Sequence, residues 1–88
     1  MTTTAELSTI ARRVSYARGL RGLSLRRLAS GAGVSHGTIF AMESRDADDA
    51  SVSTIRALAR VLDVHPAWLA FGIGAAPRPE EPAPEPRR

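Results

Sequence analysis

Two glycine–serine pairs, each with one residue between its members, divide the first half of the chain. They are Gly22-Leu-Ser24 and Gly33-Val-Ser35. Glycine adopts the left-handed conformation that ends a helix, and a serine hydroxyl accepts a hydrogen bond from a free N–H group at the start of the next one. A single residue between them allows only a tight turn. The pairs therefore predict an all-α fold in which short helices follow one another closely.

Apolar residues at helical spacing predict a first helix over residues 5–18. Its apolar stripe consists of Leu7, Ile10, Ala11, Val14 and Ala17. This stripe leaves Arg12 and Arg13 on the other faces of the helix. We therefore expect the helix to pack through its apolar face, with both arginines away from the core.

Four further helices are predicted from apolar spacing and capping residues. Their signals are Ser24 with Gly33 for the second helix, Ser35 for a third over residues 36–44, Ser51 or Ser53 for the fourth, and Pro66 for a short fifth. The side chains expected to point inward are Leu25, Leu28, Ala29, Ala32, Thr38 or Ile39, Met42, Ile55, Leu58, Ala59, Leu62 and Trp68. The five helices would form one compact domain over residues 5–73.

Residues 74–88 form a separate segment rich in proline, glutamate and arginine. The segment has no large apolar residue, so it cannot build a core of its own, and we expect it to be a disordered tail. Two roles remain open for it: a solubilising extension, or an arm that recruits a protein partner.

Several classes of protein are excluded by composition. The chain has no cysteine, and its two histidines, His36 and His65, are far apart, so neither a disulfide framework nor a structural zinc site is expected. No apolar run approaches the roughly 18 residues needed to cross a bilayer, and the first residues lack the pattern of a signal peptide. We therefore expect a cytoplasmic protein without cofactor, metal or membrane contact.

Positive charge is concentrated near the N-terminus. Residues 1–34 contain six of the twelve arginines and a single glutamate, although the whole chain has a net charge of only +3. Arginine pairs well with phosphate groups, so this half could bind a polyanion. The alternative is a hydrated helix surface in a chain that uses arginine in place of lysine. The charge alone does not decide between them.

The spacing of Ala29, Gly33 and Ile39 carries the strongest functional signal. A small residue lets two helices cross closely, a glycine permits the turn, and an apolar residue anchors the second helix of the pair. Around this core the matching residues are Gly22-Leu-Ser24, Leu28-Ala29, Gly33-Val-Ser35, Thr38-Ile39, Glu43, Ser53-Thr-Ile55, Leu58-Ala59, Leu62, Val64 and Trp68-Leu69. Over about residues 7–72 the series closely resembles the lambda-repressor-like (Cro/repressor, XRE-type) helix-turn-helix family.

The resemblance implies a fold of five helices whose third helix lies in the major groove of double-stranded DNA while the second crosses the phosphate backbone. Matched position by position, the residues expected to contact bases are Ser35, His36, Gly37, Phe40 and Ala41. The residues expected to contact phosphate are Ser24, Thr38, Arg18, Arg21, Arg26, Arg27 and Arg45. The family also implies a structural ion pair between Arg18 and Glu43, which would tie the first helix to the recognition helix.

The sequence differs from the family pattern at two places, so not every DNA contact of the family can be expected in this chain. Leu25 stands where the family usually has a glutamine that touches phosphate. The loop after the third helix contains Asp46, Asp48 and Asp49, and negative charge near a phosphate path would repel DNA. This acidic loop could instead point away from the DNA or bind a protein.

Two functions follow from this pattern. The first is a sequence-specific DNA-binding regulator, in particular a small dimeric repressor of phage or mobile-element type, with Phe71 and Ile73 as candidates for the two-fold interface. The second is a protein-interaction module, such as an antitoxin or anti-repressor, that uses the acidic loop or the tail. An enzyme is not expected, because neither histidine has a partner at a spacing that suits catalysis.

Overall fold

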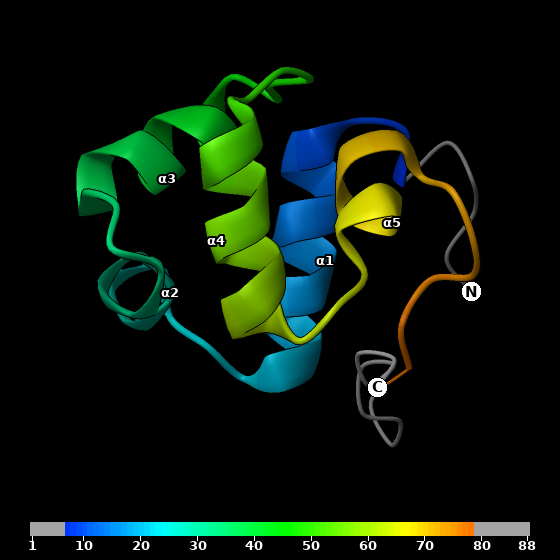
Figure 1. Cartoon of the computed structure of the whole chain (residues 1–88). Coiled ribbons are helices and arrows are strands. Elements are labelled where there is room, and N and C mark those ends of the chain that lie inside the picture. The colour runs from blue at the N-terminus through cyan, green and yellow to red at the C-terminus, as the bar shows by residue number, and fades with distance from the viewer. Residues whose placement is uncertain (1–6, 79–88) are drawn as a thin grey trace.

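A computed structural model describes residues 7–78 of the chain as a bundle of five helices (Figure 1). Their bounds are α1 (Ile10–Arg21), α2 (Leu25–Ala32), α3 (His36–Ser44), α4 (Val52–Leu62) and α5 (Pro66–Phe71). No strand occurs between residues 7 and 78. The predicted all-α class and the five helices are confirmed. Of the predicted tail, residues 79–88 lie outside the described residues, and Ala76 in its first part packs against the core.

The predicted capping residues begin the helices. The hydroxyls of Ser24, Ser35 and Ser51 each accept a hydrogen bond, 3.1 Å long, from the backbone N–H three residues later. The fourth helix is therefore capped by Ser51 and not by Ser53. At the other ends, Gly33 and Gly72 both adopt a left-handed conformation with φ of +72°. These caps satisfy backbone groups that a helix leaves without partners.

The prediction for the first helix was wrong in its bounds. The helix begins at Ile10 and not at residue 5, because the hydroxyl of Thr9 caps it by accepting a hydrogen bond from the N–H of Arg12. It continues through Gly19 and ends only at Gly22, where φ is +66°. Leu7 precedes the helix and still packs against the core. The whole helix is thus shifted toward the C-terminus.

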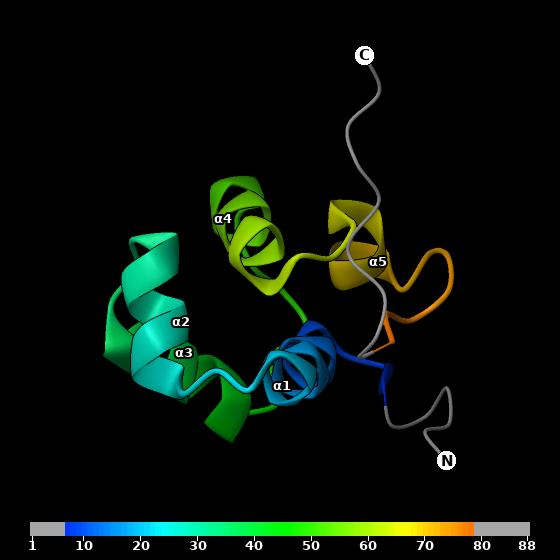
Figure 2. The ribbon, with the colours of Figure 1, turned by 90° about the horizontal axis from the view of Figure 1, so that it is seen from below.

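Helices α1 and α4 lie in the middle of the molecule, with α2 and α3 on one side and α5 on the other (Figures 1 and 2). Most residues predicted to point inward are buried, and the side chains of Leu28, Ile39, Leu58 and Leu62 are inaccessible to solvent. Leu25 is only partly buried, and Thr38 is exposed, so Ile39 is the inward residue of that pair. The indole of Trp68 is also in the core, as predicted, with its centroid 6.5 Å from that of Tyr16.

Gly19 within α1 and Gly22 at its C-terminal cap provide a matched test of the end of this helix. A Cβ added at Gly19 or at Gly22 would meet no atom within 4 Å, so substitution changes only the backbone. We expect Gly19→Ala to raise the free energy of unfolding by about 0.5–1 kcal/mol, and Gly22→Ala to lower it by about 1–2 kcal/mol because of the left-handed conformation. Urea unfolding followed by circular dichroism measures both. A loss of stability in Gly19→Ala would contradict the observed helix end.

Candidate nucleic-acid interface

The turn between α2 and α3 has the close geometry that the spacing predicted. Ala29 is 3% exposed where the two helices meet, and its carbonyl accepts a hydrogen bond of 3.1 Å from the N–H of Val34. Gly33 turns the chain, and Ile39 anchors α3 in the core with no exposed surface. The position of α3 is therefore fixed by packing from one side only.

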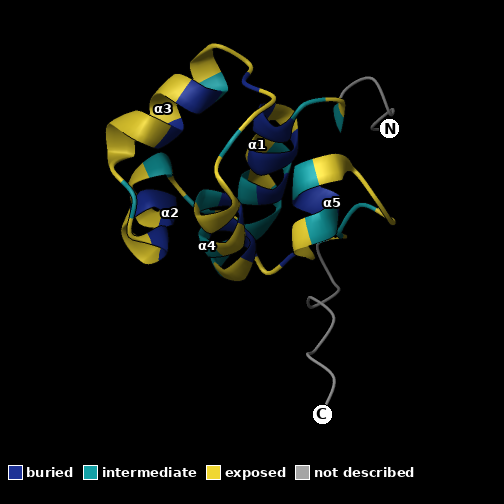
Figure 3. Cartoon of the chain, turned by 45° about the horizontal axis from the view of Figure 1, so that its top comes forward, coloured by how far each residue is buried: buried dark blue, intermediate teal, exposed yellow. Residues whose placement is uncertain are grey.

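The opposite side of α3 is open to solvent (Figure 3). The residues predicted to contact DNA from this helix and its cap are all exposed: Ser35, His36, Gly37, Thr38, Phe40 and Ala41. Phe40 is 56% exposed, so a large apolar residue lies on this open side of the helix. The helix thus presents a continuous free face of small, apolar and imidazole groups.

The polar groups on this face are not equally available. The hydroxyls of Ser35 and Thr38 lie 2.7 Å apart and bond to each other, and Ser35 also caps the helix. The imidazole of His36 has no hydrogen-bond partner among residues 7–78, so both of its nitrogens are available to a ligand. His36 is therefore the side chain best suited to hydrogen-bond a base edge.

The pair between Arg18 and Glu43 is present and joins α1 to α3. Its two hydrogen bonds, from Nε and Nη2 of Arg18 to the two carboxylate oxygens, are both 3.0 Å long. A third N–H of Arg18 donates to the carbonyl of Leu23 at 3.1 Å. Both side chains are largely shielded from solvent, with 23% and 16% exposure. This bidentate geometry orients α3 relative to the rest of the bundle.

The other arginines predicted to contact phosphate fall into two groups. Arg21 uses two of its N–H groups inside the fold, because it donates to the carbonyls of Leu62 at 2.8 Å and Asp63 at 2.9 Å. Arg26 and Arg27, by contrast, are exposed at the start of α2, and their guanidinium groups make no hydrogen bond or ion pair within residues 7–78. Arg45 is exposed after α3. Arg26 and Arg27 are therefore the guanidinium groups of this set that have no partner in residues 7–78, whereas Nη1 of Arg45 lies 3.9 Å from the carboxylate of Asp49.

Two aspartates of the acidic loop have a structural role that the sequence did not indicate. Asp46 accepts a hydrogen bond of 2.6 Å from the hydroxyl of Thr9 and forms an ion pair of 3.2 Å with Arg12. Asp48 accepts one of 3.1 Å from the N–H of Ile10. The hydroxyl of Thr9, supported by Arg12, lowers the pKa of Asp46. Both carboxylates thus lie at the N-terminus of α1, where the helix dipole favours negative charge.

Arg13 was placed wrongly by the sequence analysis, because it is buried. Only 5% of its surface is exposed, and its guanidinium donates to three carbonyls: Leu7 at 2.6 Å, Leu69 at 2.8 Å and Ala70 at 3.1 Å. Burial lowers its pKa, against the attraction of Asp48. The carbonyls of Leu69 and Ala70 belong to the end of α5, so Arg13 caps that helix. Helical spacing alone gives no sign of a partner 56 residues away.

Leu25, which replaces the usual glutamine of the family, packs partly against the core. The first residue of α2 therefore contributes apolar contact in place of a polar group. Arg26 and Arg27 follow directly in the chain.

Comparison with known proteins agrees with this geometry. A helix-turn-helix family model matches residues 14–69. The chain belongs to the lambda-repressor-like helix-turn-helix family. This is a family of DNA-binding regulators and not of enzymes. No curated protein sequence gives a significant match.

A similar solved structure is a chain of the SinR protein/SinI protein complex, with a TM-score of 0.64 and 30% sequence identity. The similarity covers 69% of the present chain and 59% of that chain, so the present chain corresponds to little more than half of its length. Within residues 7–78, no helix is long and apolar enough to span a bilayer, and no three potential metal-binding side chains lie together.

The Arg18–Glu43 pair should contribute more to stability than a half-exposed pair in the same fold. In a double-mutant cycle with Arg18→Met and Glu43→Gln, we expect a coupling energy of about 1–3 kcal/mol, because the hydrogen bonds are charged and shielded. The pair of Arg12 and Asp46 serves as the control and should give a smaller value, since solvent screens it. Urea unfolding of all variants gives both couplings. Equal couplings would contradict the bidentate, shielded geometry.

Proposed function

We propose that this chain is a sequence-specific transcriptional regulator of the cytoplasm, a small dimeric repressor of phage or mobile-element type that binds double-stranded DNA without a cofactor. The observation that carries the proposal is the free face of α3 beside unpaired arginines. This face has no function inside the fold, and the exposed charge next to it has the sign that attracts phosphate. Repression would come from occupying the operator.

In this proposal α3 enters the major groove and the start of α2 lies on the phosphate backbone. Arg26 and Arg27 are the main phosphate contacts, with Ser24, Thr38 and Arg45 beside them. Arg18 and Arg21 contribute through the hydrogen-bond donors that remain after their contacts within the fold. Phosphate contacts of this kind position the protein but do not identify the sequence.

Base recognition would rest on few side chains. His36 is the main hydrogen-bonding group, and Ser35 adds a hydroxyl at the start of the helix. Phe40 and Ala41 offer apolar contact that suits the methyl group of thymine. Gly37 lets the backbone of α3 approach the base edges. A protein that makes so few hydrogen bonds to base edges would depend on DNA shape as well.

A dimer would place two such helices on one operator. Phe71 and Ile73 are 75% and 63% exposed, and they lie at the α5 end of the molecule, away from α3 (Figure 1). An interface at this end leaves both recognition helices free. Two-fold symmetry would then set half-sites about 34–36 Å apart, which is one turn of DNA.

The alternative function, a protein-interaction module, has less support in the structure. Asp46 and Asp48 favoured it as long as they had no other role, but both bind the N-terminus of α1. The similar SinR chain is found in a complex with the SinI protein, but the match covers only part of that chain. No contact of the described residues favours this function over DNA binding.

Selection from random duplexes, followed by binding across a salt series, tests the proposal. We expect a two-fold symmetric site for the parent. Arg26→Ala should weaken binding to all duplexes and make the salt dependence less steep by about one unit of slope. His36→Ala should change the preferred base at one or two positions, at a cost of about 1–3 kcal/mol for the parent site. Arg60→Ala, an exposed arginine on α4, is the control and should bind like the parent. Failure to prefer any duplex would overturn the proposal.

Gly37→Ala separates stability from DNA binding. A Cβ at this position meets no atom within 4 Å in the free protein, so the variant should unfold with a free energy about 0.5–1 kcal/mol higher. Its affinity for the selected site should nevertheless fall several-fold, because the added methyl would stand between α3 and the base edges. Gly19→Ala on α1 is the matched control, with the same gain in stability and unchanged affinity. Unchanged affinity in Gly37→Ala would show that the backbone does not come close to DNA.

A further inference from the structure

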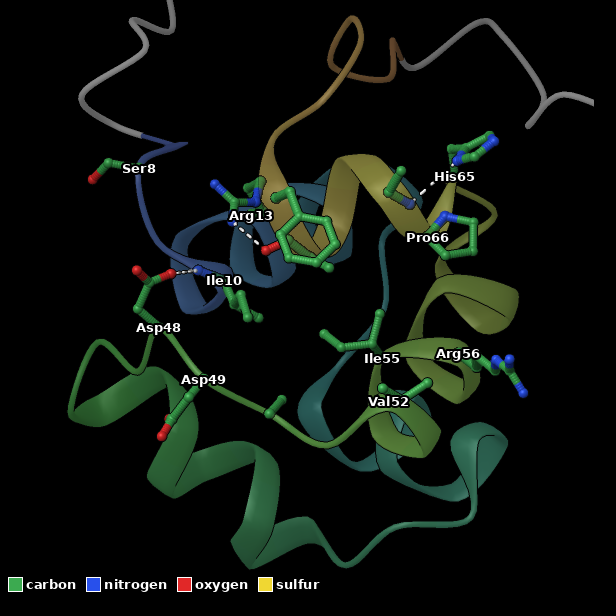
Figure 4. Close-up of a pocket in the computed structure, with 14 residues that line it drawn as sticks. Ser8, Ile10, Arg13, Asp48, Asp49, Val52, Ile55, Arg56, His65 and Pro66 are labelled. Carbon is green, nitrogen blue, oxygen red and sulfur yellow. Dashed lines mark hydrogen bonds between the residues drawn. The ribbon is translucent and has the colours of Figure 1, made fainter.

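A groove of about 770 Å³ lies between the start of α4, the loop before it and α5 (Figure 4). Its apolar lining includes Ile55 and Ala70, together with Val52 and Phe71, which are 69% and 75% exposed. Large apolar side chains exposed in a concave surface usually mark a binding site. The groove lies on the α5 side of the bundle, so it is separate from the free face of α3 (Figures 1 and 2).

The two sides of the groove carry opposite charge. Asp48 and Asp49 lie on one side, and Arg56 and His65 on the other, with apolar residues between them (Figure 4). Arg56 makes no hydrogen bond or ion pair within residues 7–78. His65 accepts a hydrogen bond of 3.2 Å at Nδ1 from the N–H of Ala67, which leaves Nε2 free to donate. A complementary occupant is therefore acidic at the His65 side, apolar in the middle and basic at the other side.

The chain itself contains a segment with this order of groups. Residues 79–88 read Pro-Glu-Glu-Pro-Ala-Pro-Glu-Pro-Arg-Arg, so three glutamates precede two arginines and four prolines are spread among them. Proline favours an extended conformation that docks on apolar and aromatic surfaces at a low cost in entropy. Along the segment, the charges follow the order that the groove requires from its His65 side to its aspartate side.

The described part of the chain brings this segment to the matching side of the groove. Ala76 packs against the core and Pro77 is partly buried, so the chain stays on the bundle after α5. In Figure 1 the last described residues and the connection that contains His65 are at the bottom, whereas the loop between α3 and α4, with Asp48 and Asp49, is at the top. Ten extended residues span about 31 Å, and the bundle is 32 Å across at its widest. The segment is therefore long enough to cross the groove.

We propose that residues 79–88 dock in this groove of their own chain, with their glutamates beside Arg56, their prolines on Phe71 and their two arginines beside Asp49. Because the segment is tethered, its effective concentration at the groove is on the order of 1 mM, and a weak intrinsic affinity is sufficient. The docked segment covers Phe71, so any partner that binds this end of α5 has to displace it. The inference does not depend on DNA binding.

A spin label on the segment tests the docking in the full chain. The chain has no cysteine, so Ala83→Cys gives a single site for a nitroxide in the middle of the segment. In dilute protein at low salt, we expect the amide resonances of Val52, Arg56 and Ala70 to broaden relative to the reduced label, and that of His36 on α3 to stay sharp. Added salt should reduce the broadening, because it screens exposed charges.

The order of the charges provides a matched control. One variant exchanges the two ends of the segment and keeps its composition, net charge and prolines: Glu80→Arg, Glu81→Arg, Arg87→Glu and Arg88→Glu. We expect its broadening at the groove to fall at least about threefold, because like charges now face each other. Arg56→Glu should have a similar effect. Arg60→Glu changes an arginine of the same helix outside the groove lining and should behave like the parent. Circular dichroism verifies that each variant is folded.

Three results would overturn the proposal. Equal broadening in the parent and the exchanged variant would mean that the segment only stays near its point of attachment. If spin-labelled chains broaden the resonances of isotope-labelled chains without a label to the same extent, the segment docks on another molecule. If no groove resonance broadens, the groove does not hold the segment. None of these results changes the expected binding of the parent to a selected duplex, so the proposed function is tested separately.

Discussion

The fold depends on the arginine side chains of α1. All four arginines of this helix reach a different part of the chain: Arg12 binds the loop after α3 through Asp46, Arg13 caps the end of α5, Arg18 holds Glu43 of α3, and Arg21 donates to the end of α4. Carbonyl groups at helix ends have no partner within the helix, so a guanidinium with several donors can satisfy two at once. The helix thus fixes its neighbours by polar contacts at their ends in addition to apolar packing.

This arrangement changes the meaning of the basic front half of the chain. Four of its six arginines are engaged with the protein itself, which leaves Arg26 and Arg27 as guanidinium groups without a partner in residues 7–78. The guanidinium groups that have no contact within the fold are therefore fewer than the composition suggests. They are also better placed, because both residues lie at the start of α2, beside the recognition helix. A count of arginines would have overestimated the DNA-binding surface.

The sequence was sufficient to predict elements whose signals are local. Serine caps and glycine ends lie within a few residues of the helix they define, so the bounds of the second and third helices followed directly. The first helix was misplaced although its cap, Thr9, and its end, Gly22, are local signals; Asp48, which accepts from the N–H of Ile10, lies 38 residues away. The burial of Arg13 was missed because its carbonyl partners on α5 are distant in sequence. The exposed residues of α3 were predicted because the resemblance to the family assigns these positions of the helix to the side that faces DNA.

The position of α1 also links the two surfaces on which the function depends. Through Arg18 and Glu43 it orients α3, whose exposed face is the proposed DNA contact, and through Arg13 it holds the end of α5, beside the groove. Both contacts are made by one helix, so the direction of α3 is fixed relative to α5. In the proposed dimer such a constraint would keep the two copies of α3 at the spacing of one turn of DNA. The buried and shielded arginines of α1 therefore fix the direction of α3 relative to α5 in addition to stabilising the bundle.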